Sequence, residues 1–122
     1  MQSLGVGVAT VDGFVLEVIL TFFLVFTVFA TTVDKRGSAA WAPLAIGMVI
    51  FVDHLIAVQV TGASMNPARS FGPALIHGAW DVHWLYWAGP IVGGLLAAIA
   101  YVVIFGTKED QYKLGTINIR SD

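Results

Sequence analysis

The chain has 122 residues, of which 57% are apolar and only 11% are charged. Soluble domains carry about 25% charged residues, so this composition indicates a membrane protein. The formal net charge of −2 argues against nucleic acid as a partner, and the absence of cysteine excludes disulfides, thiolate metal sites and cysteine catalysis.

Three apolar segments are long enough to cross a bilayer as helices. They follow a leading segment, residues 1–13, which lacks the basic start and long apolar core of a cleavable signal peptide. A crossing needs about 20 residues at a rise of about 1.5 Å each to span a hydrocarbon layer of about 30 Å. We therefore predict an all-α membrane protein with spanning helices at residues 14–33, 41–60 and 84–105.

The distribution of basic residues predicts the orientation of these spans. Lys35 and Arg36 lie between the first two spans, and the tail, residues 107–122, carries three more basic residues. The long connection at residues 61–83 carries only Arg69. Because basic loops stay on the cytoplasmic side, we expect the first loop and the tail to be cytoplasmic.

The stretch between the second and third spans, "TGASMNPARSFGPALIH" at residues 61–77, is polar at its start and contains two helix-breaking prolines. Asn66 is a favoured N-cap and Pro67 suits the first helical position, although Pro73 interrupts the hydrogen-bond ladder. A helix from Pro67 to the end of the stretch would rise roughly 16 Å, and five extended residues, 61–65, would descend by the same roughly 16 Å. We predict a re-entrant loop and half-helix, which at membrane depth must be buried in protein or line water.

The same arithmetic places two polar side chains at one depth. Arg69 would lie about one turn above Asn66, roughly 10 Å below the outer edge of the hydrocarbon layer, and His54 would lie roughly 9 Å below that edge. Such groups are costly inside a membrane unless water reaches them. A narrow aqueous constriction between His54 and Arg69 would account for both residues.

The motif "TGASMNPARSFGPA", the "DHL" in the helix before it and the "HWLYWAGP" after it resemble the second signature loop of the aquaporin, or major intrinsic protein, family. The similarity runs up to Phe105 and corresponds to the second half of that family. It implies one half of an inverted-repeat fold, whose two half-helices meet at mid-membrane, and passive water transport with proton exclusion. The pore motif would be Asn66, Pro67 and Ala68, with the Asn66 amide donating to each passing water and the helix N-terminus repelling cations.

The resemblance also assigns residues that determine selectivity. His54, Ala63 and Arg69 match three positions of the family's outer selectivity filter, and the fourth, aromatic position belongs to the half that this sequence lacks. Four further residues look like the water-selective branch rather than the glycerol-conducting one: Ser70, Ala74, Tyr86 and Trp87. Water is therefore the favoured permeant, with a glycerol or small neutral solute facilitator as the alternative.

Glu17, in the first predicted span, has two interpretations. The family resemblance implies a buried carboxylate that braces the backbone of the re-entrant loop. A carboxylate near a helix end could instead reach the membrane interface, as long charged side chains do.

The resemblance implies a pore with two half-helices, and this chain supplies one. A fragment of a longer channel is the favoured explanation, and a separate first half or a non-conducting assembly or regulatory partner of full-length aquaporins are the alternatives. The implied partners are water, the lipid bilayer and the missing first half, with a homotetramer expected for the full-length channel. No nucleophile–base set, metal cluster or cofactor motif is apparent, so we expect neither an enzyme nor a bound metal. The sequence is compatible with the plasma membrane and with the vacuolar membrane.

Overall fold

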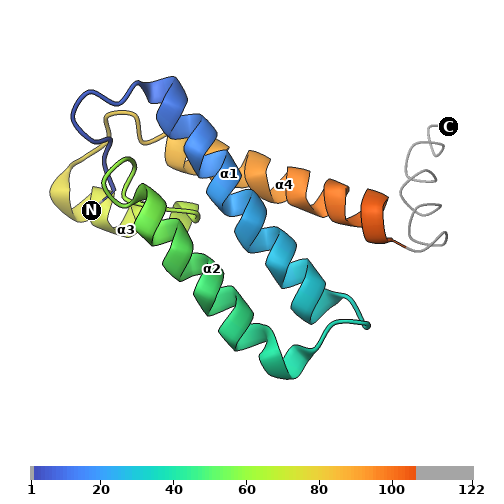
Figure 1. Ribbon diagram of the computed structural model, residues 1–122. Coiled ribbons are helices and arrows are strands. Elements are labelled where there is room, and N and C mark those ends of the chain that lie inside the picture. Colours follow the sequence, from blue (N-terminus) through green and yellow to red (C-terminus); the bar gives the residue numbers. More distant parts are fainter. Residues whose placement is uncertain (1, 107–122) are drawn as a thin grey trace, which may run out of the picture.

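The computed structural model describes residues 2–106, and all regular structure within this range is helical. The predicted cytoplasmic tail, residues 107–122, lies outside the described residues. Figure 1 shows the arrangement of the four α-helices. Their bounds are Thr10–Val28 for α1, Ala42–Ala57 for α2, Pro67–His77 for α3 and Leu85–Phe105 for α4.

Three helical stretches are long and apolar enough to cross a membrane, as the sequence predicts. They are Thr10–Val33, Ala39–Ala57 and Leu85–Phe105, with 24, 19 and 21 residues. The first joins α1 to a π-helical turn, Phe29–Val33, and the second adds a 3-10 turn, Ala39–Trp41, to the start of α2. The predicted fold class, an all-α protein with three potential spans and a half-helix, is confirmed.

Two predicted helix ends were wrong by a few residues. The first helix begins at Thr10 rather than at residue 14, and Asp12 in its first turn complements the positive helix N-terminus. The second helix ends at Ala57 rather than at residue 60. The carbonyl of Ala57 accepts hydrogen bonds from the N–H groups of Val60 and Thr61, at 3.0 and 2.9 Å, which closes a turn instead of continuing the helix.

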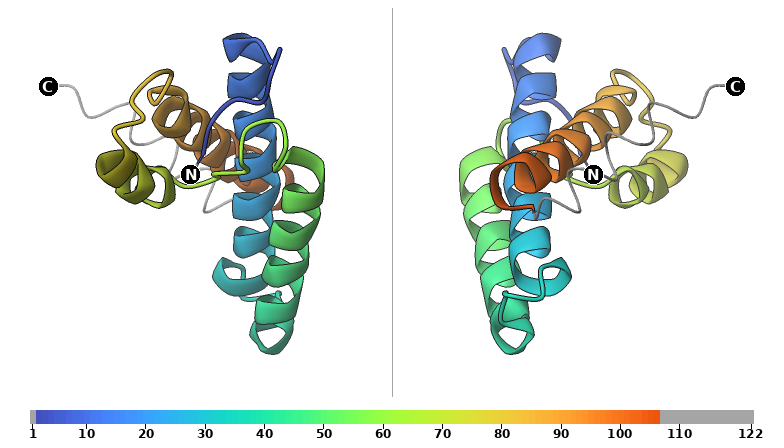
Figure 2. Two further views of the ribbon diagram at one scale, coloured as in Figure 1. Left: turned by 90° about the vertical axis from the view of Figure 1, so that its left-hand side faces the viewer. Right: turned by 90° about the vertical axis from the view of Figure 1, so that its right-hand side faces the viewer.

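The half-helix α3 has the predicted bounds and the predicted cap. Asn66 has extended backbone angles and its side chain accepts hydrogen bonds from the first turn, while Gly78 ends the helix in the left-handed conformation, with φ of 67°. Pro73 lies inside the helix without ending it. Figure 2 shows α3 lying to one side of the pair formed by α1 and α2.

The loop before α3 is not the extended segment that the sequence predicted. Gly62, Ala63 and Met65 have φ values of 81°, 49° and 53°, so the backbone turns repeatedly instead of descending straight. An extended strand would leave its N–H groups without partners at this depth. The turns direct those groups toward Thr61 and Glu17, which accept them.

Helices α1 and α4 cross at very close range (Figure 1), and two glycines of α4 permit the contact. A methyl group on Gly93 would lie 2.3 Å from the backbone oxygen of Val18, and one on Gly89 would lie 2.8 Å from Cβ of Glu17. Any larger residue would therefore push the two helices apart. The Gly89–Gly93 pair, four residues apart, is the small-residue contact typical of membrane helices.

The loop between α1 and α2 is tied to the far end of α4. The Asp34 carboxylate accepts hydrogen bonds from Arg36 and from the Tyr101 hydroxyl, each at 2.7 Å, and Arg36 also donates to the carbonyl of Phe105 at 2.6 Å. These bonds, first those from Arg36 and then that from Tyr101, hold the pKa of the Asp34 carboxyl well below its usual range.

Candidate functional site

Glu17 is fully buried in α1 and is the main hydrogen-bond acceptor for the re-entrant loop. One carboxylate oxygen accepts from the Thr61 hydroxyl at 2.6 Å and from the Ser64 N–H at 2.9 Å, and the other accepts from the Met65 N–H at 2.8 Å. With 0% of its surface exposed, Glu17 does not reach a membrane interface. The carboxylate instead satisfies loop donors that have no helical partner.

The left-handed residues of the loop depend on these contacts. Ala63 and Met65 both have positive φ, a conformation that costs free energy for residues other than glycine. The Thr61 hydroxyl oxygen accepts the N–H of Ala63 at 3.2 Å, and Glu17 accepts the N–H of Met65. The buried acceptors therefore hold a backbone shape that the sequence alone would not favour.

Two of the four residues that match the water-selective branch touch this loop. The Tyr86 hydroxyl of α4 donates to the Thr61 carbonyl at 2.8 Å, and the Ser70 hydroxyl of α3 contacts that of Ser64. Ser64 in turn donates to the carbonyl of Asn66 at 2.9 Å.

Within residues 2–106, the side chains of the other two residues of that set form no hydrogen bond to the loop. Ala74 is buried in α3, with 2% of its surface exposed. Trp87 is 44% exposed and meets the ring of Phe71 edge-on, with 6.2 Å between ring centroids.

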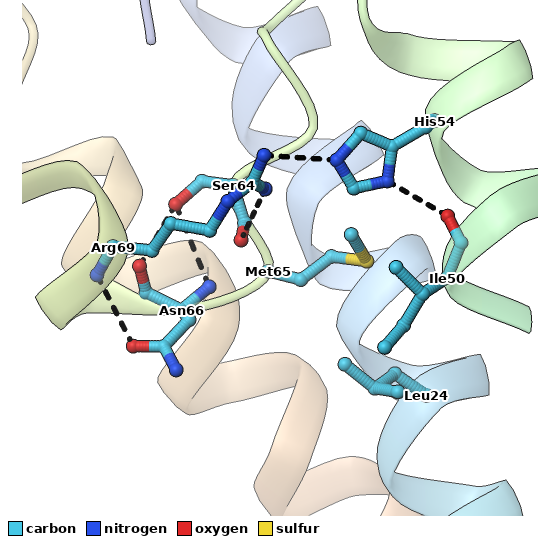
Figure 3. Close-up of a pocket in the computed structure, with 7 residues that line it drawn as sticks. All are labelled: Leu24, Ile50, His54, Ser64, Met65, Asn66 and Arg69. Carbon is cyan, nitrogen blue, oxygen red and sulfur yellow. Dashed lines mark hydrogen bonds between the residues drawn. The ribbon is translucent and has the colours of Figure 1, made fainter. Parts of the chain in front are cut away.

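Asn66 uses one end of its side chain to cap α3 and leaves the other end free. Its Oδ1 atom accepts from the N–H groups of Ala68 and Arg69, at 2.9 and 3.4 Å. Within residues 2–106, no hydrogen-bond acceptor reaches Nδ2, which points away from the loop in Figure 3. The residue therefore presents two donor hydrogens beside the positive end of a helix.

The structure brings Arg69 and His54 together, at the common level that the sequence predicted. The Arg69 guanidinium donates from Nη1 to the carbonyls of Ala63 and Ser64, and Nη2 lies 2.9 Å from Nε2 of His54 (Figure 3). A guanidinium can only donate, so Nε2 accepts and the ring proton is on Nδ1, which donates to the carbonyl of Ile50 at 2.7 Å. Both side chains are thereby fixed in orientation.

Ala63 contacts Arg69 through its backbone. Its carbonyl oxygen accepts from Arg69, whereas its methyl group is completely buried in a small core with Leu20, Ala57 and Met65. The resemblance assigned a filter position to this residue; in the structure its carbonyl oxygen, and not its buried methyl group, contacts Arg69.

The loop and the two facing helices enclose a cleft of about 250 Å³ (Figure 3). Apolar side chains form one wall and polar groups form the other, which is an arrangement suited to single small polar molecules. Asn66 and Arg69 are exposed, so the cleft is open on one side. Its lining residues are Leu24, Ile50, His54, Ser64, Met65, Asn66 and Arg69.

Thr61 and Ser64 were not among the predicted site residues, although both are buried in the loop with at most 1% of their surface exposed. A signal for them was present in the sequence. Hydroxyl side chains in a segment predicted to enter the membrane must find hydrogen-bond partners there, because water and lipid tails do not supply them.

Comparison with known proteins identifies the protein family that this chain resembles. Residues 1–101 match the sequence model of the family described as "Major intrinsic protein". Probable aquaporin TIP4-1 of Oryza sativa subsp. japonica is 46% identical over 115 residues, which cover 93% of this chain and 46% of that protein. Aquaporin-4 of Rattus norvegicus is 51% identical over 112 residues, covering 83% of this chain and 34% of that protein. Aquaporin TIP2-1 of Arabidopsis thaliana is 49% identical over 117 residues, covering 94% and 47%. The chain thus spans between a third and a half of the length of these relatives.

Proposed function

The chain belongs to the major intrinsic protein family, and from this premise we propose that it forms the second half of a water channel. The family membership predicted from the sequence is confirmed, and the chain is a multi-pass integral membrane protein. The proposed activity is passive transport of water across the bilayer with exclusion of protons. Residues 14–106 would be the channel half; helices α2, α3 and α4 lie within this range, and α1 begins four residues before it, at Thr10.

The observation that carries this proposal is the free amide of Asn66 at the capped start of α3. A water molecule in the cleft would accept a hydrogen bond from Nδ2, and the positive helix end would orient the oxygen toward the loop. A water molecule held in this way cannot pass a proton to the next water molecule in a single-file column. The same positive potential opposes hydronium and metal cations. The transport step makes and breaks hydrogen bonds only, so no nucleophile or cofactor is required.

Selectivity for water over glycerol rests on the pair formed by Arg69 and His54. The two side chains contact each other at 2.9 Å, and Arg69 also donates to two loop carbonyls. These contacts hold the guanidinium of Arg69 beside the ring of His54. We therefore favour water as the permeant, and the glycerol facilitator is the second candidate. The charged guanidinium also opposes the entry of cations from that side.

The open side of the cleft is where the missing half of the channel would lie. Asn66 and Arg69 are exposed on that side, and a pore wall cannot face lipid with unpaired polar groups. A first half with its own half-helix would complete the wall, and the completed channel would assemble as a homotetramer. A chain that covers this side without conducting water would be an assembly partner instead.

A chimera tests the channel proposal. The first half of rat aquaporin-4 would be joined ahead of residue 1, and the product would be reconstituted in liposomes and exposed to an osmotic gradient. Fast shrinkage with a low activation energy is expected. Shrinkage no faster than that of empty liposomes would refute the channel proposal, and co-purification of the 122-residue chain with intact aquaporins would then favour the assembly role.

A matched variant connects the flux to Asn66. Asn66→Asp keeps the oxygen that caps α3 but replaces the free amide donor with a charged oxygen. The helix should therefore remain folded while water flux falls toward the level of empty liposomes. Unchanged flux in this variant would remove Asn66 from the proposed mechanism.

A further inference from the structure

The loop between α1 and α2 carries a serine close to two basic residues. We propose that Ser38 is a phosphorylation site for serine/threonine kinases that recognise basic residues, and that its phosphate draws Arg36 away from the end of α4. Lys35 and Arg36 stand three and two positions before Ser38, and the sequence predicts that this loop is cytoplasmic. The inference does not depend on the proposed channel function.

Ser38 is accessible to a second protein. Lys35, Arg36, Ser38 and the two alanines that follow are exposed, and the backbone of Ser38 is extended, with φ of −99° and ψ of 94°. Ser38 precedes the 3-10 turn at the start of the second span, but its side chain does not cap that turn. Within residues 2–106, its hydroxyl makes no hydrogen bond. The hydroxyl can therefore react without first losing a partner.

Other hydroxyl groups that stand near basic residues lack this combination of exposure and an unused hydroxyl. Ser70 directly follows Arg69, but only 2% of its surface is exposed and its hydroxyl contacts that of another serine. Thr31 and Thr32 precede the loop, and their hydroxyls donate to carbonyls one helical turn earlier, each at 2.7 Å. The structure thus distinguishes Ser38 from residues that the sequence alone would rank beside it.

Arg36 joins the loop to α4. Its Nε and Nη2 atoms donate to the Asp34 carboxylate, the latter at 2.7 Å, and Nη2 also donates to the carbonyl of Phe105 at 2.6 Å. The side chain of Arg36 is 65% exposed, so solvent weakens its ion pair with Asp34. A serine phosphate carries a charge of about −1.5 to −2 at neutral pH, more than a single carboxylate carries. A phosphate two residues from Arg36 therefore competes with Asp34 for the guanidinium.

The modification is a phosphoryl transfer from a nucleoside triphosphate. The Oγ atom of Ser38 attacks the γ-phosphorus, the bond from this phosphorus to the bridging oxygen breaks, and the nucleoside diphosphate leaves. The hydroxyl proton passes to the catalytic aspartate of the kinase. In the product the phosphate oxygens accept hydrogen bonds from Arg36, and the carbonyl of Phe105 loses its donor. Of the hydrogen bonds that join Asp34 and Arg36 to α4, the one from Tyr101 remains.

The first test is phosphorylation of the 122-residue chain in detergent. The probe is the catalytic subunit of cyclic-AMP-dependent protein kinase with ATP, and mass spectrometry of peptides locates the phosphate. Ser38 and Ser38→Thr should be modified, whereas Ser38→Ala should carry no phosphate at this position. Arg36→Ala should lower the initial rate at Ser38 by about tenfold or more, which corresponds to one charge-assisted hydrogen bond. The matched control is Arg120→Ala, which removes a basic residue distant in the sequence and should leave that rate unchanged.

A second measurement tests the release of Arg36. Amide hydrogen exchange in a peptide covering residues 34–38 should become roughly 3- to 10-fold faster on phosphorylation, the factor for one net hydrogen bond. In Arg36→Ala, modified to completion by a longer incubation, the phosphate should add no further exchange because the guanidinium is already gone.

The outcomes separate this inference from the channel proposal. Absence of phosphate at Ser38, or equal rates in the parent and Arg36→Ala, would overturn the proposed site. Unchanged exchange in the phosphorylated parent would overturn the release of Arg36. Neither measurement involves water flux, so a chimera without flux would refute the channel proposal alone.

Discussion

The two faces of the re-entrant loop are held in different ways. On the face toward α1 and α4, Glu17, Thr61 and Tyr86 are at most 1% exposed and are joined by hydrogen bonds of 2.6 to 2.8 Å. On the opposite face, Asn66 and Arg69 are exposed and border an open cleft. The buried face is held by hydrogen bonds within this chain, whereas the exposed face borders the open cleft.

This difference indicates that the buried face and the exposed face of the loop have different roles. Groups that must not move are buried, where lost hydrogen bonds are costly because nothing replaces them. The polar groups of Asn66 and Arg69 remain exposed, where a hydrogen bond to water can form and break at little net cost. Substitutions on the buried face should therefore change stability, and those on the open face should change selectivity.

The largest expected effect is on the buried face, at Glu17. Glu17→Ala leaves the Thr61 hydroxyl and two loop N–H groups without an acceptor and should lower the free energy of unfolding by at least about 3 kcal/mol. Glu17→Gln, which keeps one acceptor oxygen and the same shape, should cost less. Denaturant titration in detergent measures both, and equal stability of the two variants and the parent would contradict the bracing role.

The contact between α1 and α4 should be the next most sensitive. Gly93→Ala places a methyl group 2.3 Å from the backbone oxygen of Val18 and should cost about 1–3 kcal/mol of stability. Gly94→Ala is the matched control, since its nearest neighbour would be Cγ2 of Val25 at an ordinary 3.7 Å. Thermal unfolding of both variants tests the contact, and a drop of the same size in Gly94→Ala would show that spacing at Gly93 is not the cause.

On the open face, Arg69→Val should leave stability nearly unchanged and alter selectivity. Removal of the guanidinium frees the carbonyls of Ala63 and Ser64 and widens the space beside His54. We expect the ratio of glycerol to water permeability in the chimera to rise about tenfold, which corresponds to about 1.4 kcal/mol in relative barrier height. Arg69→Lys keeps the positive charge but lacks the planar guanidinium with its several N–H donors. This variant should give a glycerol-to-water permeability ratio between those of the parent and Arg69→Val. An unchanged ratio in both variants would remove Arg69 from the filter.

The smallest effect is expected far from the loop, at Asp34. Its pKa is lowered by Arg36 and Tyr101, so its bonds stabilise the folded chain above the pKa of an unfolded aspartate, about 4, and this contribution is lost as the pH falls toward the depressed folded value. Asp34→Asn should therefore melt slightly below the parent at pH 7, and the difference should shrink below about pH 4. Asp81→Asn, at an exposed surface carboxylate, is the control. A difference that grows on acidification would contradict the sign of this linkage.

Several features of the fold and the site followed from the sequence because they depend on neighbouring residues. The three apolar runs, the Asn66 cap and the bounds of the half-helix from Pro67 to His77 all reflect local hydrophobicity and capping. The common level of His54 and Arg69 followed from counting residues along helices of known rise.

The conformation of residues 61–65 could not be derived in this way. The extended form predicted from reach was wrong because partners distant in the sequence, Glu17 above all, decide where the loop N–H groups point. The same holds for the hydroxyl of Tyr86 on Thr61 and for Asp34 on Tyr101, which join residues 25 and 67 positions apart.

The sequence by itself therefore determined which segments of this protein are apolar enough to cross a membrane and where the half-helix α3 starts, since transfer from water and capping act within a few residues. Only the tertiary structure decided which buried donor meets which acceptor. In an environment without water each polar group must find a partner inside the protein, and the crossing of α1 and α4 at two glycines determines which partners come within reach.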